Sequence, residues 1–185
     1  MKILCIFGMP ASGKTIFSDK AKQLGIFTLT ITDIIREEMQ KKGIIYTENN
    51  ERKMTEWFYK NNRELMRKII DKITEAKNPD PIVIEGFVSP DQIQNLKDRL
   101  CGEKVFTVAI HSPPEIRWER EKQRLRYHEN AYKNIRKRDE MEIDMGLSKL
   151  IAVADHMIVN SGNLSEFRKT VKDKLIELLN IDVKR

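Results

Sequence analysis

Short runs of apolar residues without polar alternation recur along the chain. Such runs are typical of strands that are buried on both faces of a parallel sheet, where neither face contacts water. Strands are predicted at residues 2–7, 26–31, 82–84, 105–110 and 156–159. A sheet of this kind needs helices on both of its faces to cover it.

The segments between these runs place apolar residues at roughly helical spacing. Helices are predicted at residues 14–24, 33–43, 47–76, 92–100, 114–125, 131–144, 147–154 and 164–179. Segment 47–76 is interpreted as one long helix, which the prolines of Asn78-Pro79-Asp80-Pro81 end. Strands alternating with helices predict an α/β fold, a three-layer sandwich around a five-stranded parallel sheet with right-handed crossovers. Its ligands are expected at the carboxyl ends of the strands.

Composition limits the class of protein. The chain has 185 residues, of which 40% are hydrophobic and 34% charged, as expected of one globular domain covering residues 1–185. No apolar run approaches the roughly 20 residues that span a bilayer, and the first strand lacks the features of a signal peptide. We therefore expect a cytoplasmic protein without membrane contact. Cys5 and Cys101 are predicted to be reduced core residues.

The net charge of +6 is concentrated in one segment. Residues 117–138 contain nine Lys or Arg against three Glu, so the remainder of the chain is close to neutral. A nucleic-acid-binding protein usually presents a basic patch or stripe with interleaved aromatic residues. In this segment only Trp118, Tyr127 and Tyr132 are aromatic. Nucleic acid is therefore a less favoured partner than a small molecule, and the oligomeric state stays open.

The chemistry begins directly after the first strand, where the pattern G-x-x-x-x-G-K-T leads into a helix. Its glycines let the backbone N–H groups point inward, and the helix N-terminus adds positive charge, so that the loop can cradle phosphates. Lys14 is expected to reach the β- and γ-phosphates of ATP, and the Thr15 hydroxyl to ligate Mg²⁺. The predicted ATP-binding loop consists of Gly8, Met9, Pro10, Ala11, Ser12, Gly13, Lys14 and Thr15.

A candidate acceptor site follows the second strand, in Thr32-Asp33-Ile34-Ile35-Arg36. This segment is similar to the G-D-x-x-R stretch of adenylate kinases and other nucleoside monophosphate kinases, in which the arginine grips the acceptor phosphate. The resemblance implies that role for Arg36. Asp33 also matches the aspartate that dephospho-coenzyme A kinases place near the acceptor hydroxyl, which makes it a candidate general base. Capping of the helix by Asp33 is the alternative, and the two roles can coexist.

The third strand ends in Glu85-Gly86-Phe87, which resembles the D-G-F-P-R element of adenylate kinases. The resemblance implies that Glu85 and Gly86 lie on the acceptor side and that Glu85 holds a Mg²⁺-bound water. An ordinary carboxylate at a strand end is the alternative for Glu85. The chain departs from the family pattern because Glu replaces Asp, and because Val88-Ser89 stands where an acceptor-gripping arginine would be.

A basic helical hairpin is predicted at residues 114–144. Arg117, Arg120 and Arg124 recur at spacings of three and four, which places them along one helix face. A solvated charged helix is the alternative, but nucleotide kinases carry their lid after the fourth strand. Arg120 and Arg124 best match the lid arginines of that family, which stabilise the charge of a transferring phosphoryl group.

The segment from Ala154 to Gly162 is similar to the A-D-x-x-I-x-N-x-G segment of dephospho-coenzyme A kinases. In that family the turn lies beside the donor adenine, which implies that Asn160 and Gly162 bind ATP. The combined match runs from Lys2 to about Phe167. It most resembles an archaeal family of kinase-like ATP-binding proteins, related to adenylate kinases and similar to dephospho-coenzyme A kinases.

Three functions are consistent with these motifs. The leading hypothesis is an ATP- and Mg²⁺-dependent phosphotransferase of the adenylate kinase type, which acts on a nucleoside monophosphate or a related small-molecule acceptor. Its acceptor-binding helical region would cover residues 32–77. A dephospho-coenzyme A kinase is the first alternative. The second alternative is an ATP-binding regulatory or nucleic-acid-associated protein with weak ATPase activity.

Overall fold

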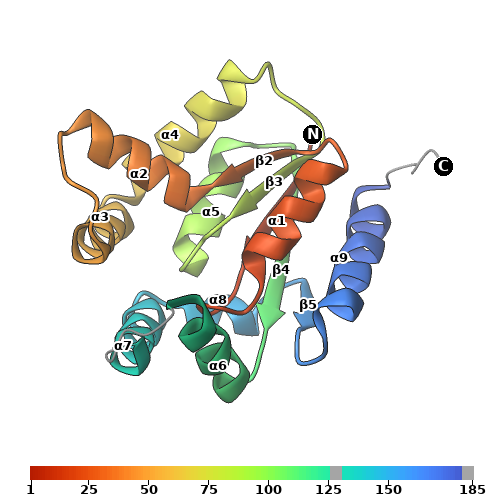
Figure 1. Ribbon diagram of the computed structural model, residues 1–185. Helices are drawn as coiled ribbons and strands as arrows, with labels where there is room; N and C mark the ends of the chain where they lie inside the picture. The colour runs from red at the N-terminus through yellow and green to blue at the C-terminus, as the bar shows by residue number, and fades with distance from the viewer. Residues whose placement is uncertain (126–130, 181–185) are drawn as a thin grey trace.

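The computed structural model describes residues 1–125 and 131–180, and the side chains within these ranges except at 124, 125 and 131–134. Its strands are β1 (Lys2–Phe7), β2 (Phe27–Thr30), β3 (Ile82–Glu85), β4 (Lys104–His111) and β5 (His156–Val159). They form one parallel sheet in the order β2-β3-β1-β4-β5 (Figure 1). The predicted parallel sheet is therefore confirmed, with β1 in its centre.

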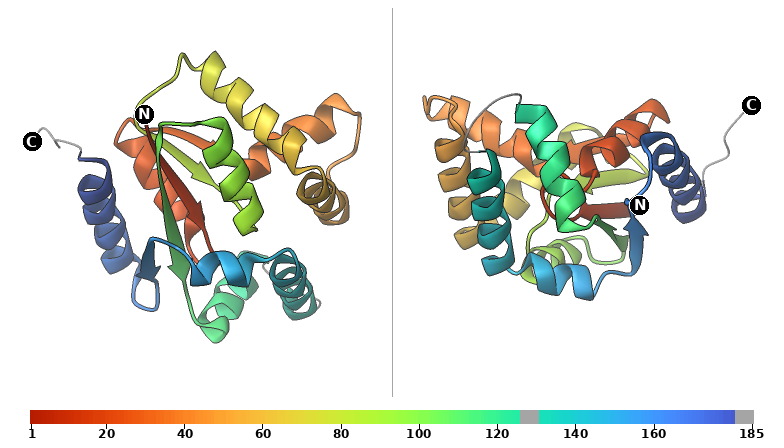
Figure 2. Two further views of the ribbon diagram at one scale, coloured as in Figure 1. Left: turned by 180° about the vertical axis from the view of Figure 1, so that it is seen from behind. Right: turned by 60° about the horizontal axis from the view of Figure 1, so that its bottom comes forward.

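Helices cover both faces of the sheet (Figures 1 and 2). The helices are α1 (Lys14–Gln23), α2 (Ile31–Lys41), α3 (Glu48–Lys60), α4 (Asn62–Glu75), α5 (Pro90–Arg99), α6 (Pro114–Leu125), α7 (Ala131–Asp144), α8 (Leu147–Ala152) and α9 (Leu164–Leu179). Helices α1 and α9 pack on one face, and α4, α5 and α8 pack on the other. Helices α6 and α7 lie near the carboxyl ends of the strands, as the lid prediction requires.

The central strand explains why the apolar runs do not alternate with polar residues. Ile3, Cys5 and Phe7 of β1 enter the larger core cluster, whereas Leu4 and Ile6 enter the cluster beneath α1 and α9. Successive side chains of a strand point to opposite faces, so both faces of β1 are buried. Apolar residues at consecutive positions are the result.

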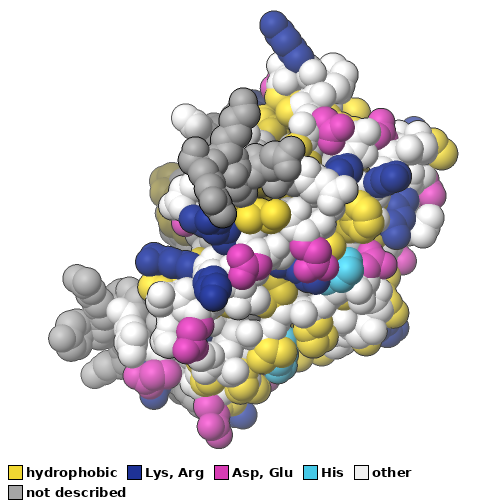
Figure 3. All heavy atoms as spheres, turned by 90° about the vertical axis from the view of Figure 1, so that its right-hand side faces the viewer, with side chains coloured by type: hydrophobic (Ala, Val, Ile, Leu, Met, Phe, Trp, Pro, Cys, Tyr) yellow, Lys and Arg dark blue, Asp and Glu magenta, His cyan; other side chains and the backbone are white. Residues whose placement is uncertain are grey.

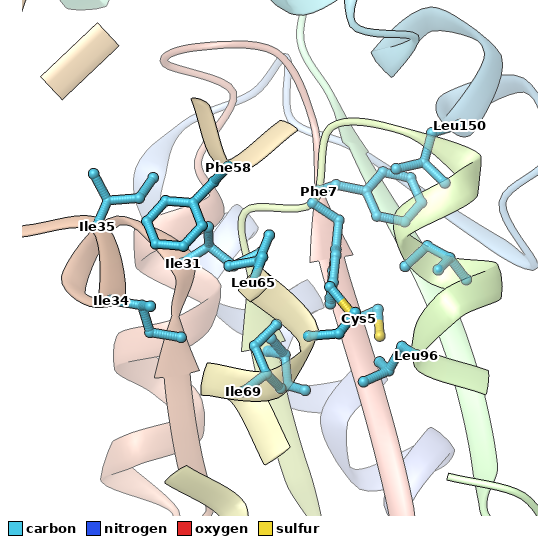
Figure 4. Close-up of a cluster of buried hydrophobic side chains, with 14 of the residues drawn as sticks. Cys5, Phe7, Ile31, Ile34, Ile35, Phe58, Leu65, Ile69, Leu96 and Leu150 are labelled. Carbon is cyan, nitrogen blue, oxygen red and sulfur yellow. The ribbon is translucent and has the colours of Figure 1, made fainter. Parts of the chain in front are cut away.

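The larger cluster attaches the helices α2, α3 and α4 to the sheet (Figure 4). Phe58 of α3 and Leu65 of α4 are almost completely buried, and both pack in the cluster that contains Ile31 and Ile35 of α2. Complete burial of one such side chain stabilises the fold by about 1.5–3 kcal/mol. This core holds the helical region after β2 in a fixed position relative to the strand ends.

The long helix expected at residues 47–76 is two helices, α3 and α4, which run in different directions. The break lies at Asn61, whose backbone has φ −108° and ψ 50°. Its backbone N–H and its side-chain Nδ2 both donate to the Trp57 carbonyl oxygen at 2.8 Å, which holds Asn61 against the last turn of α3. Helical periodicity continues on both sides of the break, so spacing alone did not locate it.

The cysteine prediction holds for only one of the two residues. Cys5 is buried in the core, and burial raises the pKa of its thiol. Cys101 is exposed in the turn between α5 and β4, so its prediction as a core residue is wrong. Among the helices of the described residues, none is long and apolar enough to cross a membrane.

Candidate functional site

The loop from Gly8 to Thr15, here called the phosphate loop, joins β1 to α1. Gly8 has φ 155° and Gly13 has φ 112°. A Cβ atom on Gly8 would lie 2.2 Å from the Ile110 carbonyl oxygen, and a Cβ atom on Gly13 would lie 2.5 Å from Asn160 Nδ2. Both positions therefore require glycine for close approach to the neighbouring strands. The backbone then curls directly in front of the N-terminus of α1.

Lys14 folds back over the phosphate loop. Its Nζ donates hydrogen bonds to the carbonyl oxygens of Gly8 at 2.6 Å and Met9 at 3.1 Å. Burial lowers the pKa of the Lys14 ammonium, and the carboxylates of Glu142 and Glu85 oppose that effect. The ammonium group is thus held at the positive end of α1, where an anion is also favoured.

Asn160, at the end of β5, braces the phosphate loop. Its side chain is buried, and Nδ2 donates to the Ser12 carbonyl oxygen at 2.8 Å. Its backbone N–H donates to the His111 carbonyl oxygen at 2.7 Å, and the Ser112 hydroxyl donates to the Asn160 carbonyl. Asn160 therefore lies beside the phosphate loop, and its contact with ATP stays a prediction. Gly162 lies in the exposed turn between β5 and α9.

Arg120 of α6 lies on the same side of the loop as Asn160. Its Nη2 donates to Asn160 Oδ1 at 3.1 Å and to the Asn160 carbonyl oxygen at 3.2 Å. Its Nη1 donates to Ser112 Oγ at 2.9 Å and approaches the Ala11 carbonyl oxygen at 3.4 Å. The predicted lid arginine thus contacts the loop directly. Arg124 lies one turn later in α6, and its side chain is outside the described residues.

Arg117 has a structural role that its place in the basic segment does not reveal. Arg117 is 3% exposed, and its guanidinium donates two hydrogen bonds to Asp139 of α7, at 2.9 and 2.8 Å. It also donates to the carbonyl oxygens of Pro10 at 3.1 Å and Ser112 at 3.2 Å. One buried arginine therefore joins α6 to α7 and both of them to the phosphate loop. Asp139, its partner, is a residue that the sequence did not single out.

A pocket of about 350 Å³ opens beside the phosphate loop, a size that suits a small ligand. The loop contributes Gly8, Lys14 and Thr15. The region of α2 and α3 contributes Thr32, Arg36, Tyr46, Glu48, Glu51 and Arg52, among others. The turn after β3 contributes Gly86, Phe87 and Val88, and α7 contributes Arg138, Met141 and Glu142. The predicted donor loop and the predicted acceptor arginine therefore line one pocket.

The structure separates Asp33 from Arg36. Asp33 is exposed, accepts a hydrogen bond from the Thr30 hydroxyl, and lines a different hollow together with Glu37 and Lys72. Asp33 lies one helical turn before Arg36, so helix geometry alone would keep the two together. The hydrogen bond from the Thr30 hydroxyl holds the Asp33 carboxylate away from the pocket. The two residues were expected to face the acceptor together, and Arg36 alone lines the pocket.

Glu85 lies at the end of β3, beside Ile6 of β1 in the sheet register. It is 8% exposed, and its Oε2 accepts a hydrogen bond from the Ser18 hydroxyl of α1. Ser18 follows Thr15 by one helical turn, so the carboxylate is held near the start of α1. Within the described residues, no three side chains of His, Cys, Asp or Glu form a metal-binding group. The Glu85 carboxylate and the Thr15 hydroxyl are hard oxygen ligands, which suit a Mg²⁺ ion that is also bound to a phosphate.

Several pocket residues were not foreseen from the sequence. Arg36 Nη2 lies 3.3 Å from Glu51 Oε1, and its guanidinium carbon lies 5.3 Å from the centre of the Tyr46 ring. A hydrogen bond with Glu51 raises the pKa of Tyr46. On the other side, burial raises the pKa of Glu142 although Lys14 and other cations act against that shift. No motif marked Tyr46, Glu51 or Glu142. Glu51 and Glu142 come from helices with an ordinary mixture of charges, and Tyr46 lies in the loop between α2 and α3.

The sheet order, the phosphate loop and the adjoining pocket define a P-loop kinase-like protein. Residues 7–138 match a protein family described as an AAA domain. A UPF0200 protein from Thermococcus gammatolerans is 32% identical over 188 residues, covering 96% of this chain and 97% of the relative. The chain belongs to the UPF0200 family.

Solved structures of small-molecule kinases share the fold. A shikimate kinase from Acinetobacter baumannii in complex with shikimate has a TM-score of 0.60 and 16% identity, covering 98% of this chain and 95% of the kinase. A dephospho-CoA kinase from Campylobacter jejuni has a TM-score of 0.57 and 17% identity, covering 97% of this chain and 98% of the kinase. At these identities the likeness extends to the fold, and the substrate must be argued from the site.

Proposed function

We propose that this protein is an ATP- and Mg²⁺-dependent kinase that transfers the γ-phosphoryl group to a nucleoside monophosphate or a related small phosphorylated acceptor. One observation carries the proposal, namely that Lys14 of the phosphate loop and Arg36 of the acceptor region line the same pocket. A donor phosphate and an acceptor anion bound by these two cations would meet in one enclosed space. Positioning of this kind supplies most of the rate in phosphoryl transfer.

The phosphate loop would bind the donor. Its inward N–H groups and the N-terminus of α1 favour the phosphates of ATP, and the Lys14 ammonium would move from the loop carbonyls to the β- and γ-phosphates. Thr15 and Glu85 are the residues that would hold Mg²⁺, Glu85 through a bound water. When bound, the cation neutralises phosphate charge. Ser18 keeps the Glu85 carboxylate in a fixed orientation for that purpose.

The hairpin of α6 and α7 would act on the transferring group. Arg120 already lies against the loop through its bonds to Asn160 and Ser112, and it would stabilise charge that develops during transfer. Arg124 keeps the same predicted role. In the proposal, residues 114–144 form the lid and residues 32–77 the acceptor-binding region, which together exclude water from the pocket. Asn160 would position the loop, with Gly162 near the donor base.

The position of Asp33 favours a phosphate as the acceptor group. A phosphate is already an anion at neutral pH, so it needs no general base to become a nucleophile. Asp33, the predicted base, is directed to the Thr30 hydroxyl and does not line the pocket. Its role in the proposal is therefore stabilisation of the first turn of α2, where an acidic residue is favourable.

Dephospho-coenzyme A kinase activity, with a hydroxyl acceptor, is the second candidate. The observation that favours it is the Glu142 carboxylate, which lines the pocket and has a raised pKa because it is buried. A carboxylate that faces the acceptor pocket is a side chain of the type that acts as a general base. The absence of an arginine at Val88-Ser89 also agrees with an acceptor other than a standard nucleoside monophosphate.

A nucleic-acid-associated ATPase is less well supported. Arg117 and Arg120 of the basic segment are turned inward and bonded to the phosphate loop, so they contribute little to an outer basic surface. On the face that contains α9 and β5, positive and negative side chains are interspersed (Figure 3). Tight RNA or DNA binding with a steep salt dependence in a filter-binding assay would favour this alternative.

One panel of assays separates the three functions. The protein is incubated with ATP and Mg²⁺ and with one acceptor at a time, either a nucleoside monophosphate or dephospho-coenzyme A, and the release of ADP is followed. We expect at least one nucleoside monophosphate to raise the rate well above basal hydrolysis. Stimulation by dephospho-coenzyme A alone would select the second candidate. If no acceptor raised the rate, the proposal of a kinase would fail.

A further inference from the structure

Arg52 of α3 lines the pocket as a cation without a bonded partner among the described residues. It is half-buried, and it forms no hydrogen bond or ion pair with any described residue. Glu48 lies one turn earlier on the same helix and lines the same pocket, and the two nevertheless form no ion pair. A guanidinium that is partly removed from water is stabilised by an anion, and its planar donors suit a phosphate or a carboxylate.

The other cations around the pocket already have partners. Arg36 is 3.3 Å from Glu51, Arg138 is 3.8 Å from Glu142, and Lys14 donates to carbonyl oxygens of the loop. Among the described residues that line this pocket, Arg52 is thus the one cation without a protein partner. Because Glu51 offsets the charge of Arg36, Arg36 alone is a weak receptor for an anion with more than one negative charge.

The turn after β3 offers no cation that could add to the charge of Arg36. Val88, an apolar residue, lines the pocket, and Ser89 is buried as the cap of α5. A cation that shares an anion with Arg36 must therefore come from another element, and Arg52 of α3 lines the same pocket.

We propose that Arg52 binds an anionic group of the acceptor, a phosphate or a carboxylate, and shares it with Arg36. The proposal rests on the proposed function, because it treats this part of the pocket as the acceptor side. It restricts the substrate class to small acceptors that carry a negative charge. An unphosphorylated nucleoside or a neutral sugar does not satisfy Arg52 and is excluded as a good substrate.

The test compares Arg52→Gln with Lys53→Gln in the full-length protein. Each substitution removes one positive charge from the same turn of α3, but Lys53 is exposed and does not line the pocket. Each protein is first saturated with Mg²⁺ and a non-hydrolysable ATP analogue, so that the phosphate loop is filled. Inorganic phosphate and, separately, acetate are then titrated, and the amide signals of the protein are followed by NMR. Thermal unfolding confirms that both variants fold.

We expect the wild-type protein to bind phosphate, acetate or both. For each anion that binds, Lys53→Gln should have the same dissociation constant as the wild type. Arg52→Gln should raise that constant by about 10- to 100-fold, as expected for the loss of a charge-assisted hydrogen bond. Arg52→Lys should lie between, because it keeps the charge but loses the fork of donors. Dependence on Arg52 for phosphate but not acetate identifies a phosphorylated acceptor, and the reverse identifies a carboxylate.

Two results of the anion titrations would overturn the inference. One is equal anion binding by Arg52→Gln and Lys53→Gln. The other is the absence of anion binding by the wild-type protein whose phosphate loop is filled. Failure of the proposed function is a different outcome, because the wild-type protein would then not bind the ATP analogue. Weaker analogue binding by Arg52→Gln alone would place Arg52 on the donor side and also overturn the inference.

Discussion

Asn160 Nδ2 donates a hydrogen bond to the Ser12 carbonyl oxygen at 2.8 Å, which joins the end of β5 to the phosphate loop. The oxygen of the same carboxamide accepts a hydrogen bond from Arg120 at 3.1 Å. One buried side chain therefore fixes the loop and an arginine of the α6–α7 hairpin relative to each other. The segment that resembles dephospho-coenzyme A kinases thus has a mechanical role in addition to its predicted place near the donor base.

Two substitutions of Asn160 test the contributions of these two hydrogen bonds. Asn160→Asp keeps the acceptor for Arg120 but loses the donor to Ser12 and places a carboxylate oxygen against a carbonyl oxygen. Asn160→Ala loses both bonds. We expect each variant to lower the free energy of unfolding by about 1–3 kcal/mol and to weaken ATP binding. Urea denaturation and calorimetric titration with a non-hydrolysable ATP analogue would measure the two effects.

Asn95→Ala is the matched control. Its Nδ2 also donates to a backbone carbonyl at 2.8 Å, but on α5 away from the loop. We expect a change of about 0.5 kcal/mol or less there. A variant of Asn160 that was as stable as the wild type and bound the analogue equally well would show that the brace is unimportant.

The buried pair of Arg117 and Asp139 should stabilise the hairpin far more than exposed pairs do. Arg117→Met leaves the Asp139 carboxylate buried without its partner, which should cost about 3–5 kcal/mol. The double variant Arg117→Met, Asp139→Leu should recover much of that loss, because it leaves no unpaired charge. Denaturant unfolding of the single and double variants forms a double-mutant cycle that measures the coupling.

Arg67 provides the contrast for this prediction. It forms close ion pairs with Glu64 and Asp71, but its side chain is 55% exposed. Arg67→Met should therefore cost about 1 kcal/mol or less. Equal losses for Arg67→Met and Arg117→Met would contradict the view that burial makes the second pair important.

Glu142 should make stability depend on pH in a defined direction. Its folded pKa is raised above the ordinary value of 4.5, mainly because the carboxyl is buried. The folded state therefore binds the proton more tightly than the unfolded state, and the stability that this provides is present below pH 4.5 and is lost as the pH rises through the folded pKa. Glu142→Gln removes this loss, so the variant should be more stable than the wild type at pH 7.

The difference between Glu142→Gln and the wild type should disappear as the pH falls below about 4.5, where the wild-type carboxyl is neutral in both states. Thermal unfolding across the pH range would measure it. Glu140→Gln, on the exposed side of the same helix, controls for a general change of charge. A variant of Glu142 that was less stable than the wild type at pH 7 would show that attraction to Lys14 and Arg138 outweighs burial.

Local patterns predicted the fold in nearly all of its elements. Buried strands are recognisable because both faces of β1 are covered, and the phosphate loop because Gly8 and Gly13 approach other residues too closely for a Cβ atom. Spacing did not reveal the break at Asn61, since apolar periodicity continues from α3 into α4. A break of that kind depends on tertiary packing rather than on a local signal.

The candidate site was predictable only where chemistry lies next to a strand end. Lys14 and Arg36 belong to such segments and line one pocket. Asp33 comes from the same segment as Arg36 but lies outside the pocket, because its carboxylate is held by the Thr30 hydroxyl and lines another hollow. Arg52 and Glu142 come from α3 and α7, where charged residues are common and only the folded chain distinguishes those that face the pocket.

The most direct test of the account is transfer of labelled phosphate from γ-labelled ATP to the acceptor found in the panel. With Mg²⁺, the wild-type protein should produce labelled acceptor. Lys14→Ala should lower the rate by at least about a hundredfold, because it removes a charge that acts on the transferring group. Lys22→Ala, an exposed lysine of the same helix, should keep the wild-type rate. Absence of labelled acceptor with the wild-type protein, or an undiminished rate in Lys14→Ala, would contradict the account.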